Sequence, residues 1–337
     1  ESLRSFRTVI FEPAALLFMM VAISCDRQSP RSYASSVAAA GTLAALVGLY
    51  QYVTNQNIIT AEEGIRRIRA FYGSPNNLGL LLDRTVPLTL ALVAASFGQA
   101  RRAIWLVALA VSGFGLALTL SLGAWIGVAV GLAVTALFLG RRWVIVVVAA
   151  GAGAAATAVA LLGRSERFLG HLDLAEGTSF LRLQVWQSGL NMIREHPLTG
   201  VGLDCFLHYY RDLGYMLPSA WREPELSHPH NWALDFWLSL GPLGLALLVA
   251  LCVWLTLTSV RLARLAPDRA TVALAGGVCG ATTAMLVHGS IDNSFFLPDL
   301  SVLFWVGFAI VRLLSSRSQT DCVTQHPSAR YEADLAP

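Results

Sequence analysis

The stretch SHPHNWALDFWLSLGPLG, residues 227–244, contains the point where a long polar segment meets an apolar run. The polar segment covers residues 164–231, and the chain on both sides of it is apolar along almost its whole length. Apolar residues make up 55% of the 337 residues and charged residues 13%, proportions that favour a membrane protein over a soluble one. We therefore expect any chemistry in the polar segment and at its borders.

The apolar runs predict the fold class. About nine of them are long enough to cross roughly 30 Å of hydrocarbon as helices. They cover residues 9–25, 34–54, 77–97, 103–121, 123–140, 142–163, 232–257, 270–290 and 299–315. The sequence thus predicts an all-α polytopic membrane protein, a helical bundle of about nine spanning helices with one long outside loop that contains amphipathic helices.

Basic residues in the short loops predict the orientation, because such residues concentrate on the cytoplasmic side. They recur at every second loop, as Arg27, Arg31, Arg101, Arg102, Arg141, Arg142, Arg261, Arg264, Arg269, Arg312 and Arg317. The loops 55–76, 164–231 and 291–298 are then expected outside.

This topology divides the chain into four parts. We expect a six-helix transmembrane part (1–163), an outside loop that acts as a lid (164–231), a three-helix transmembrane part (232–315) and a disordered cytoplasmic tail (316–337). Because the chain starts at Glu1 and shows no signal peptide, we expect a fragment that lacks earlier spanning helices.

Small residues within the spans predict surfaces where helices pack closely. They are Gly123, Gly127 and Gly131, then Gly276 and Gly280, and the run GAGAAA at 151–156.

One outside loop carries basic charge on the side that normally lacks it. Arg66, Arg67 and Arg69 precede Ser74 and Pro75, which suit the N-cap and first position of the third spanning helix. Cations beside a helix N-terminus repel its dipole, so their presence indicates an anion that binds both. Arginines that extend to lipid headgroups are the alternative.

Charged residues also occur inside that third span. Asp83 and Arg84 lie one to two turns into it, where charges are costly and face a partner or a wet cavity. The sequence leaves open a structural ion pair and a cavity lining.

The polar segment contains helix signals of its own. Leu183, Trp186, Leu190 and Ile193 have helical spacing, so residues 179–195 predict an amphipathic helix capped by Ser179. Residues 203–213 predict a second short helix after Gly202. The segment is therefore expected to fold as a lid over the bundle.

His230 precedes the seventh span and is the candidate general base. A helix N-terminus disfavours imidazolium, which keeps the ring neutral and able to accept a proton. The alternative is an interfacial side chain without catalytic function.

The pattern H-N-x9-G-x-x-G from His230 to Gly244 resembles the bacterial O-antigen ligase and polymerase superfamily, in particular its lipid A-core ligase and protein O-oligosaccharyltransferase branch. Similar segments occur in the family's order at RAFYGSPNNLG (69–79), LTLSLGAW (118–125) and RLQVWQSGLNMIREHPLTGVGLDCF (182–206), with His288 and Asp292 near the last outside turn. Two positions depart from the family pattern, Leu122 in place of an arginine and Ser239 in place of an acidic residue.

The resemblance implies a metal-independent glycosyltransferase of the C type, without cofactor, in the bacterial inner membrane. It would move a glycan from an undecaprenyl-diphosphate carrier to a hydroxyl of lipid A-core, or a similar acceptor, on the periplasmic face. Its partners would be these substrates and membrane lipid, with no nucleic acid. Arg69 and Arg182 are expected to bind the diphosphate with support from Arg66 and Arg67, and His230 to act as base. Further candidates are Asn231, Asp83, Arg84, His288 and Asp292.

Two alternatives remain. A polysaccharide polymerase would use the same donor with a lipid-linked glycan as acceptor. A transporter or flippase of lipid-linked glycans would bind without bond chemistry, but it predicts internal repeats that the sequence does not show. If the enzyme hypothesis is right, Arg69, Arg182 and His230 should converge at one cavity at the outer membrane boundary.

Overall fold

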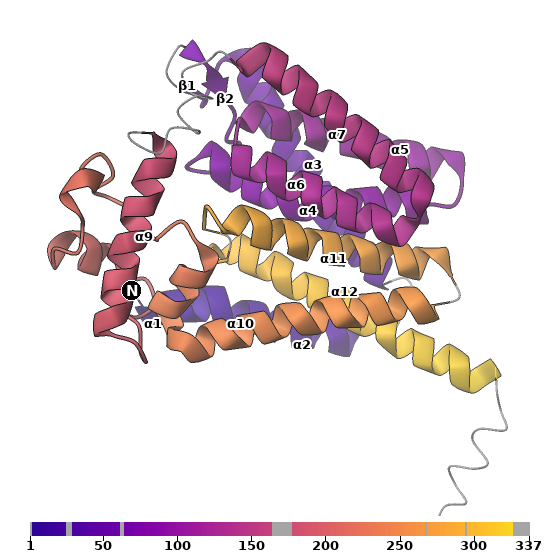
Figure 1. Ribbon diagram of the computed structural model, residues 1–337. Coiled ribbons are helices and arrows are strands. Elements are labelled where there is room, and N and C mark those ends of the chain that lie inside the picture. The colour runs from indigo at the N-terminus through magenta and orange to yellow at the C-terminus, as the bar shows by residue number, and fades with distance from the viewer. Residues whose placement is uncertain are drawn as a thin grey trace, which may run out of the picture.

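A computed structural model describes residues 2–24, 29–60, 64–163, 177–266, 268–293 and 295–325. Long helices run side by side through the body of the molecule, and shorter elements gather at one end (Figure 1). Within the described ranges, 9 helices are long and apolar enough to cross a membrane. The expected all-α polytopic fold is therefore confirmed.

The first of these helices, Ser2–Ile23, combines α1 (Ser2–Ser5), η1 (Phe6–Phe11) and α2 (Glu12–Ile23). The others are α3 (Ser29–Thr54), α4 (Pro75–Ala95), α5 (Gln99–Thr119), α6 (Leu122–Leu139), α7 (Arg141–Leu162), α10 (Trp232–Leu265), α11 (Arg269–Gly289) and α12 (Pro298–Gln325). Helix α12 continues to Gln325, so helical structure extends into the segment for which we expected disorder; residues 326–337 lie outside the described part.

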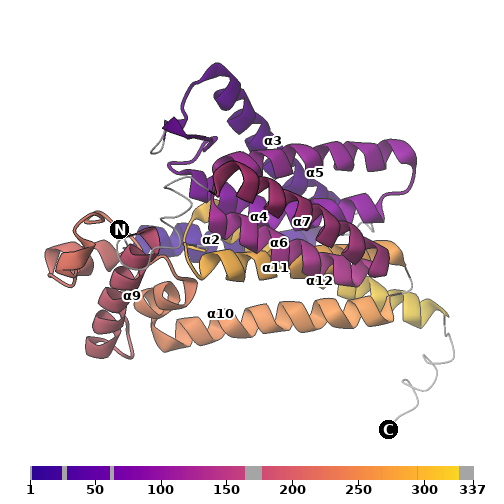
Figure 2. The ribbon, with the colours of Figure 1, turned by 45° about the horizontal axis from the view of Figure 1, so that its top comes forward.

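Helix α4 forms the centre of the bundle. Of its apolar window 94% is buried, whereas none of the α7 window is buried. Helices α3, α5, α6 and α11 all pack against α4, and Figure 2 shows α4 enclosed by its neighbours while α7 lies on the outside. The start of α4 follows the expected pattern, because the Ser74 side chain accepts from the Asn77 amide and Pro75 takes the first turn.

Glycines allow α6 and α11 to approach closely. A Cβ atom at Gly131 would lie 2.6 Å from the Gly280 carbonyl oxygen, and one at Gly280 would lie 2.1 Å from Thr135 Oγ1. The two expected packing surfaces on these helices thus face each other. The run 151–156 differs, since a Cβ at Gly151 or Gly153 would meet nothing within 4 Å in the described structure. The expectation that this run packs against another helix of the chain is wrong for that part.

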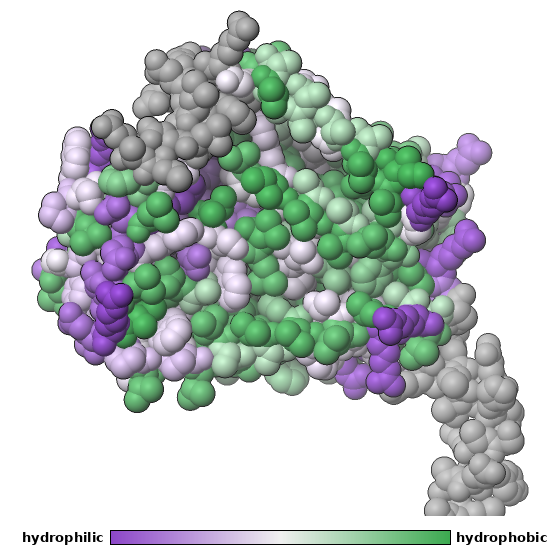
Figure 3. Space-filling model, in the orientation of Figure 1, coloured by the Kyte–Doolittle hydropathy of each residue, from purple (hydrophilic) through white to green (hydrophobic). Residues whose placement is uncertain are grey.

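The elements at one end of the bundle form a polar cap. They are β1 (Ile59–Thr60) and β2 (Arg66–Arg67), which pair antiparallel, α9 (Thr178–Glu195), η3 (His208–Asp212) and η4 (Pro218–Ala220). Helix α9 crosses the end of the bundle at a steep angle to the spanning helices (Figures 1 and 2). In Figure 3, hydrophilic residues gather at this end and at the opposite end, with a hydrophobic band between them.

The cap has an apolar core, which it shares with the start of α10. Val185 and Met192 of α9 pack with Phe206, Tyr210 and Leu238. The amphipathic helix is therefore confirmed, but its N-cap is Gly177 and not Ser179. Helix η3 is also shorter than the helix expected over residues 203–213.

A kink in α10 fastens the cap to the bundle. Gly241 adopts φ 70° and Pro242 follows it, so the Leu238 carbonyl lacks its usual helical donor. The amides of Val201 and Gly202 donate to this carbonyl instead, at 2.7 and 3.0 Å. Gly200 has φ +64°, and a Cβ there would lie 2.3 Å from the Leu238 oxygen, so only glycine permits this contact.

The glycine contacts between α6 and α11 yield a test of the fold. Gly280→Leu forces the two helices apart, and we expect a loss of stability of about 1–3 kcal/mol or more from overpacking. Thermal unfolding of the purified chain in detergent measures it. Gly153→Leu on exposed α7 is the matched control and should leave the unfolding temperature unchanged. Equal effects of the two substitutions would contradict the packing described here.

Candidate active site

Asp292, in the turn between α11 and α12, lies where several helices meet at the cap end of the bundle. The residue is 3% exposed. Its Oδ1 lies 3.2 Å from His230 Nδ1 and accepts from the Asn293 amide at 2.8 Å, and its Oδ2 accepts from Asn76 Nδ2 at 2.9 Å. A buried carboxylate is tolerated only with such partners. Asp292 therefore connects the starts of α4 and α10.

The protonation of this pair follows from its surroundings. Burial raises the pKa of Asp292, but the hydrogen bond from His230 and the electrostatic influence of the surrounding histidines, chiefly His230, outweigh it and hold the pKa well below its usual range. An ionised carboxylate can only accept, so the hydrogen of this contact lies on His230 Nδ1, and in the neutral form of the ring Nε2 is the proton acceptor. With 22% of the His230 side chain exposed, a substrate can reach it.

The local backbone holds His230 in place. Its φ is 51°, a left-handed conformation that non-glycine residues seldom adopt. Asn231 caps α10 by accepting from the amides of Ala233 and Leu234, and its Nδ2 donates to the Ser290 carbonyl at 3.0 Å. The His230 carbonyl accepts from Trp186 Nε1 of α9 at 3.4 Å. The expected position of His230 at the start of the seventh span is thus confirmed.

His228 lies against His230 but has a different environment. The ring centroids are 4.5 Å apart at 67°, and His228 Nδ1 lies 3.0 Å from Ser227 Oγ. Burial and the neighbouring His230 lower the pKa of His228 to about 4, so this ring is neutral at neutral pH.

His288 connects Asp292 to the charges inside the bundle. It is 1% exposed, with Nε2 4.0 Å from Asp292 Oδ2 and Nδ1 2.9 Å from Asp83 Oδ2. Asp83 in turn pairs with Arg84 at 2.9 Å. A Cβ at Gly123 would lie 2.6 Å from His288 Cδ2, so the glycine surface of α6 also makes room for this ring.

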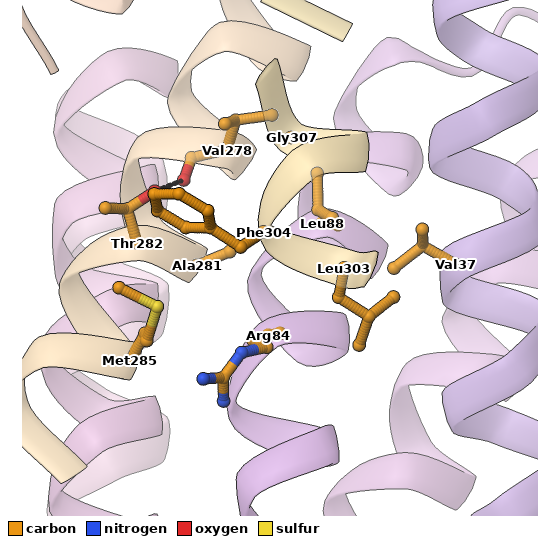
Figure 4. Close-up of a pocket in the computed structure, with 10 residues that line it drawn as sticks. All are labelled: Val37, Arg84, Leu88, Val278, Ala281, Thr282, Met285, Leu303, Phe304 and Gly307. Atoms are coloured by element: carbon orange, nitrogen blue, oxygen red, sulfur yellow. Dashed lines mark hydrogen bonds between the residues drawn. The ribbon is translucent and has the colours of Figure 1, made fainter. Parts of the chain in front are cut away.

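The sequence left open whether Asp83 and Arg84 form an ion pair or line a cavity, and the structure contains both arrangements. Besides pairing with Asp83, Arg84 lines a pocket between α3, α4, α11 and α12 together with Met285, Leu303 and Phe304 (Figure 4). The pocket lining is otherwise mostly apolar and includes neither Arg69, Arg182 nor His230.

The three arginines of the loop between α3 and α4 have different surroundings. Arg67 is buried and donates from Nε to the Thr119 carbonyl at 2.7 Å and from Nη2 to Asn76 Oδ1 at 2.9 Å. Asn76 also donates to Asp292, so the Asn76 side chain links Arg67 to the carboxylate that pairs with His230.

The other two arginines of this loop contact residues in the loop or at the end of α3. Arg66 is exposed and its guanidinium lies 4.4 Å from the Tyr52 ring centroid. Arg69 donates to the backbone and side-chain oxygens of Asn57 and to the Gly73 carbonyl. Arg66 is exposed and Arg69 is half-buried, so both lie near the surface of the cap end.

Arg182 lies on α9 one turn before Trp186, on the helix face that contacts the His230 carbonyl. It is half-buried and makes no hydrogen bond or ion pair with the rest of the described chain. No such contact joins Arg69, Arg182 and His230 directly in the described residues, so their convergence on one cavity stays a prediction.

Sequence reasoning missed two features of this site. Asn76 joins Arg67 to Asp292, and His228 contacts His230. The only signal for Asn76 was its place in the first turn of a helix that begins beside the arginines. His228, His230 and Asp292 also each offer one ligand atom to a common metal ion, with all three atoms within 4.8 Å of one another.

Comparison with known proteins bears on the identity of the chain. The family model described as O-antigen ligase matches residues 106–249, a segment that contains Arg182, His228, His230 and the kink of α10. A search of curated proteins finds no match. The matched segment also carries the H-N-x9-G-x-x-G pattern, whose histidine the structure pairs with Asp292. Over residues 106–249 the chain is therefore similar to the O-antigen ligase family.

Proposed function

We propose that the chain is a glycosyltransferase that moves a glycan from an undecaprenyl-diphosphate carrier to a hydroxyl of lipid A-core. The reaction takes place at the polar cap, on the periplasmic face of the inner membrane. The observation that carries the proposal is the His230–Asp292 pair, which leaves Nε2 of a partly exposed histidine free to accept a proton. The family match supports ligase or polymerase activity in general.

In the proposed reaction, His230 Nε2 takes the proton of the acceptor hydroxyl while its oxygen attacks the anomeric carbon. The bond from that carbon to the diphosphate oxygen breaks, and the carrier diphosphate leaves with the electron pair. Asp292 orients the ring through Nδ1 and stabilises the imidazolium that forms, since the two groups are 3.2 Å apart. His230 and Asp292 thus divide base and orienting roles.

The leaving diphosphate requires positive charge, which guanidinium groups can supply without a metal cofactor. Arg182 is the best candidate for direct contact, because its guanidinium is uncommitted in the described structure and shares a helix face with Trp186. Arg67 holds Asn76 against Asp292 and so positions the base. Arg66 and Arg69 add positive charge at the rim, where they attract the anionic carrier.

The same geometry serves a polymerase or a protein O-oligosaccharyltransferase, which differ in the acceptor. Product analysis with purified chain in proteoliposomes separates the possibilities. We expect glycan on lipid A-core together with release of undecaprenyl diphosphate. Glycan extended on the carrier or on protein would assign the other acceptors, and movement of intact donor without bond cleavage would support a transporter.

His230 carries the largest expected effect. His230→Ala should lower transfer by about 10²–10⁴-fold, the usual contribution of a positioned base. His228→Ala, two residues away, should retain nearly the wild-type rate, because His228 makes no hydrogen bond to Asp292. Donor binding should persist in both. If His228→Ala lost transfer while His230→Ala kept it, the assignment of the base to His230 would be wrong.

Asp292 is tested by a change that keeps its shape. The amide of Asp292→Asn can donate to Nδ1 and so favours the His230 tautomer with hydrogen on Nε2, which cannot act as base. We expect kcat to fall by roughly 10²–10⁴-fold with little change in donor affinity. Asp299→Asn is the matched control, since Asp299 accepts from Tyr72 at 2.6 Å at the same end of the bundle. Wild-type kcat in Asp292→Asn would refute the orienting role.

Arg182 is tested with charge retained. Arg182→Lys removes the planar pair of donors, and the loss of a charge-assisted hydrogen bond of about 1.5–3 kcal/mol lowers kcat/KM roughly 10–100-fold. Arg194→Lys on the same helix is the control, because Arg194 is exposed and donates to Asn191 at 3.0 Å. Equal rates for the two variants would leave general electrostatic attraction as the better account.

A further inference from the structure

His228, His230 and Asp292 form a group of potential metal ligands that the proposed reaction uses only in part. One ligand atom from each residue lies within 4.8 Å of the other two. The imidazole rings of His228 and His230 meet at 67°, and both residues are half-buried, so an ion can enter from the surface. Asp292 closes the group from the buried side with 3% exposure.

We propose that these three residues bind a divalent transition-metal ion of the zinc class, and that this ion inhibits the enzyme. Two imidazole nitrogens and one carboxylate oxygen suit Zn²⁺, Co²⁺ or Ni²⁺, whereas Mg²⁺ and Ca²⁺ prefer oxygen ligands alone. Three protein ligands leave one position of a tetrahedral site for water or anion.

The geometry needs only small side-chain movements. Zinc bonds of about 2.0–2.2 Å place tetrahedral ligands roughly 3.3–3.5 Å apart. His230 Nδ1 and Asp292 Oδ1 already lie 3.2 Å apart. One ligand atom from each of the three residues lies within 4.8 Å of the other two. Rotation of the His228 ring, whose Nδ1 contacts only the Ser227 hydroxyl, can close the remaining gap.

Inhibition follows from the identity of the ligands and rests on the proposed function. An ion on His230 Nε2 occupies the lone pair that would accept the acceptor proton. An ion on Nδ1 displaces the hydrogen that faces Asp292 and leaves hydrogen on Nε2. In both cases the ring no longer acts as base, so the metal competes with catalysis.

Metal binding can be measured without the reaction. Titration of the purified chain with Co²⁺ should give one saturable visible absorption band that Zn²⁺ displaces. His228→Ala should lose this band, and His228→Asn, which keeps a polar side chain, should lose it too. His208→Ala is the matched control, because His208 pairs with Asp212 at 3.1 Å at the surface and no third ligand joins them among the described residues. A wild-type chain without saturable binding, or an unchanged band in both His228 variants, would overturn the site.

The effect on transfer is measured separately. We expect Zn²⁺ to inhibit the wild-type chain, EDTA to reverse it, and EDTA alone to leave the rate unchanged. Measured against its own metal-free rate, His228→Ala should need at least about tenfold more Zn²⁺ for half inhibition, because it has lost one ligand; tenfold corresponds to about 1.4 kcal/mol of binding free energy. Equal zinc sensitivity of wild type and His228→Ala would refute inhibition through this site. If wild type shows no transfer at all, the proposed function fails, and the Co²⁺ titration still decides the metal site.

Discussion

The hydrogen bonding of Asp292 is the constraint on which the arrangement of this end of the molecule depends. A buried carboxylate is costly unless every oxygen finds a donor, and the donors here come from His230, Asn76 and the Asn293 amide. These groups belong to the loop before α10, the start of α4 and the turn after α11. Satisfying one buried charge therefore fixes the relative positions of three parts of the chain and the tautomer of one histidine.

The kink of α10 fixes the position of the cap relative to the bundle. Pro242 removes the donor for the Leu238 carbonyl, and the amides of Val201 and Gly202 replace it. The turn that follows α9 is thereby held against α10, which keeps Trp186 on the His230 carbonyl. The glycine and proline residues of the motif after His230 thus have a structural role, because they hold the helix that carries Arg182 next to His230.

The sequence predicted features that depend on neighbouring residues. Apolar runs indicated the spans, and Ser74 with Pro75 indicated the start of α4. The sequence also placed His230 directly before the seventh span, which is α10. Contacts between distant segments were harder to predict: Asn76 and Asp292 are joined across 216 positions. Ser179 was expected as a cap, but helix α9 starts one residue earlier at Thr178. The run at 151–156 has the small residues of a packing surface, yet small residues alone do not specify a partner.

The central claim is that Asp292 holds His230 with hydrogen on Nδ1 and a bare Nε2. The most direct measurement is a ¹⁵N spectrum of the histidine-labelled chain at neutral pH, in which the His230 signals are assigned by their loss in His230→Gln. The account predicts a protonated Nδ1 and an unprotonated Nε2 for His230, with the tautomer changed in Asp292→Asn. Hydrogen on Nε2 and none on Nδ1 in the wild-type chain would contradict it.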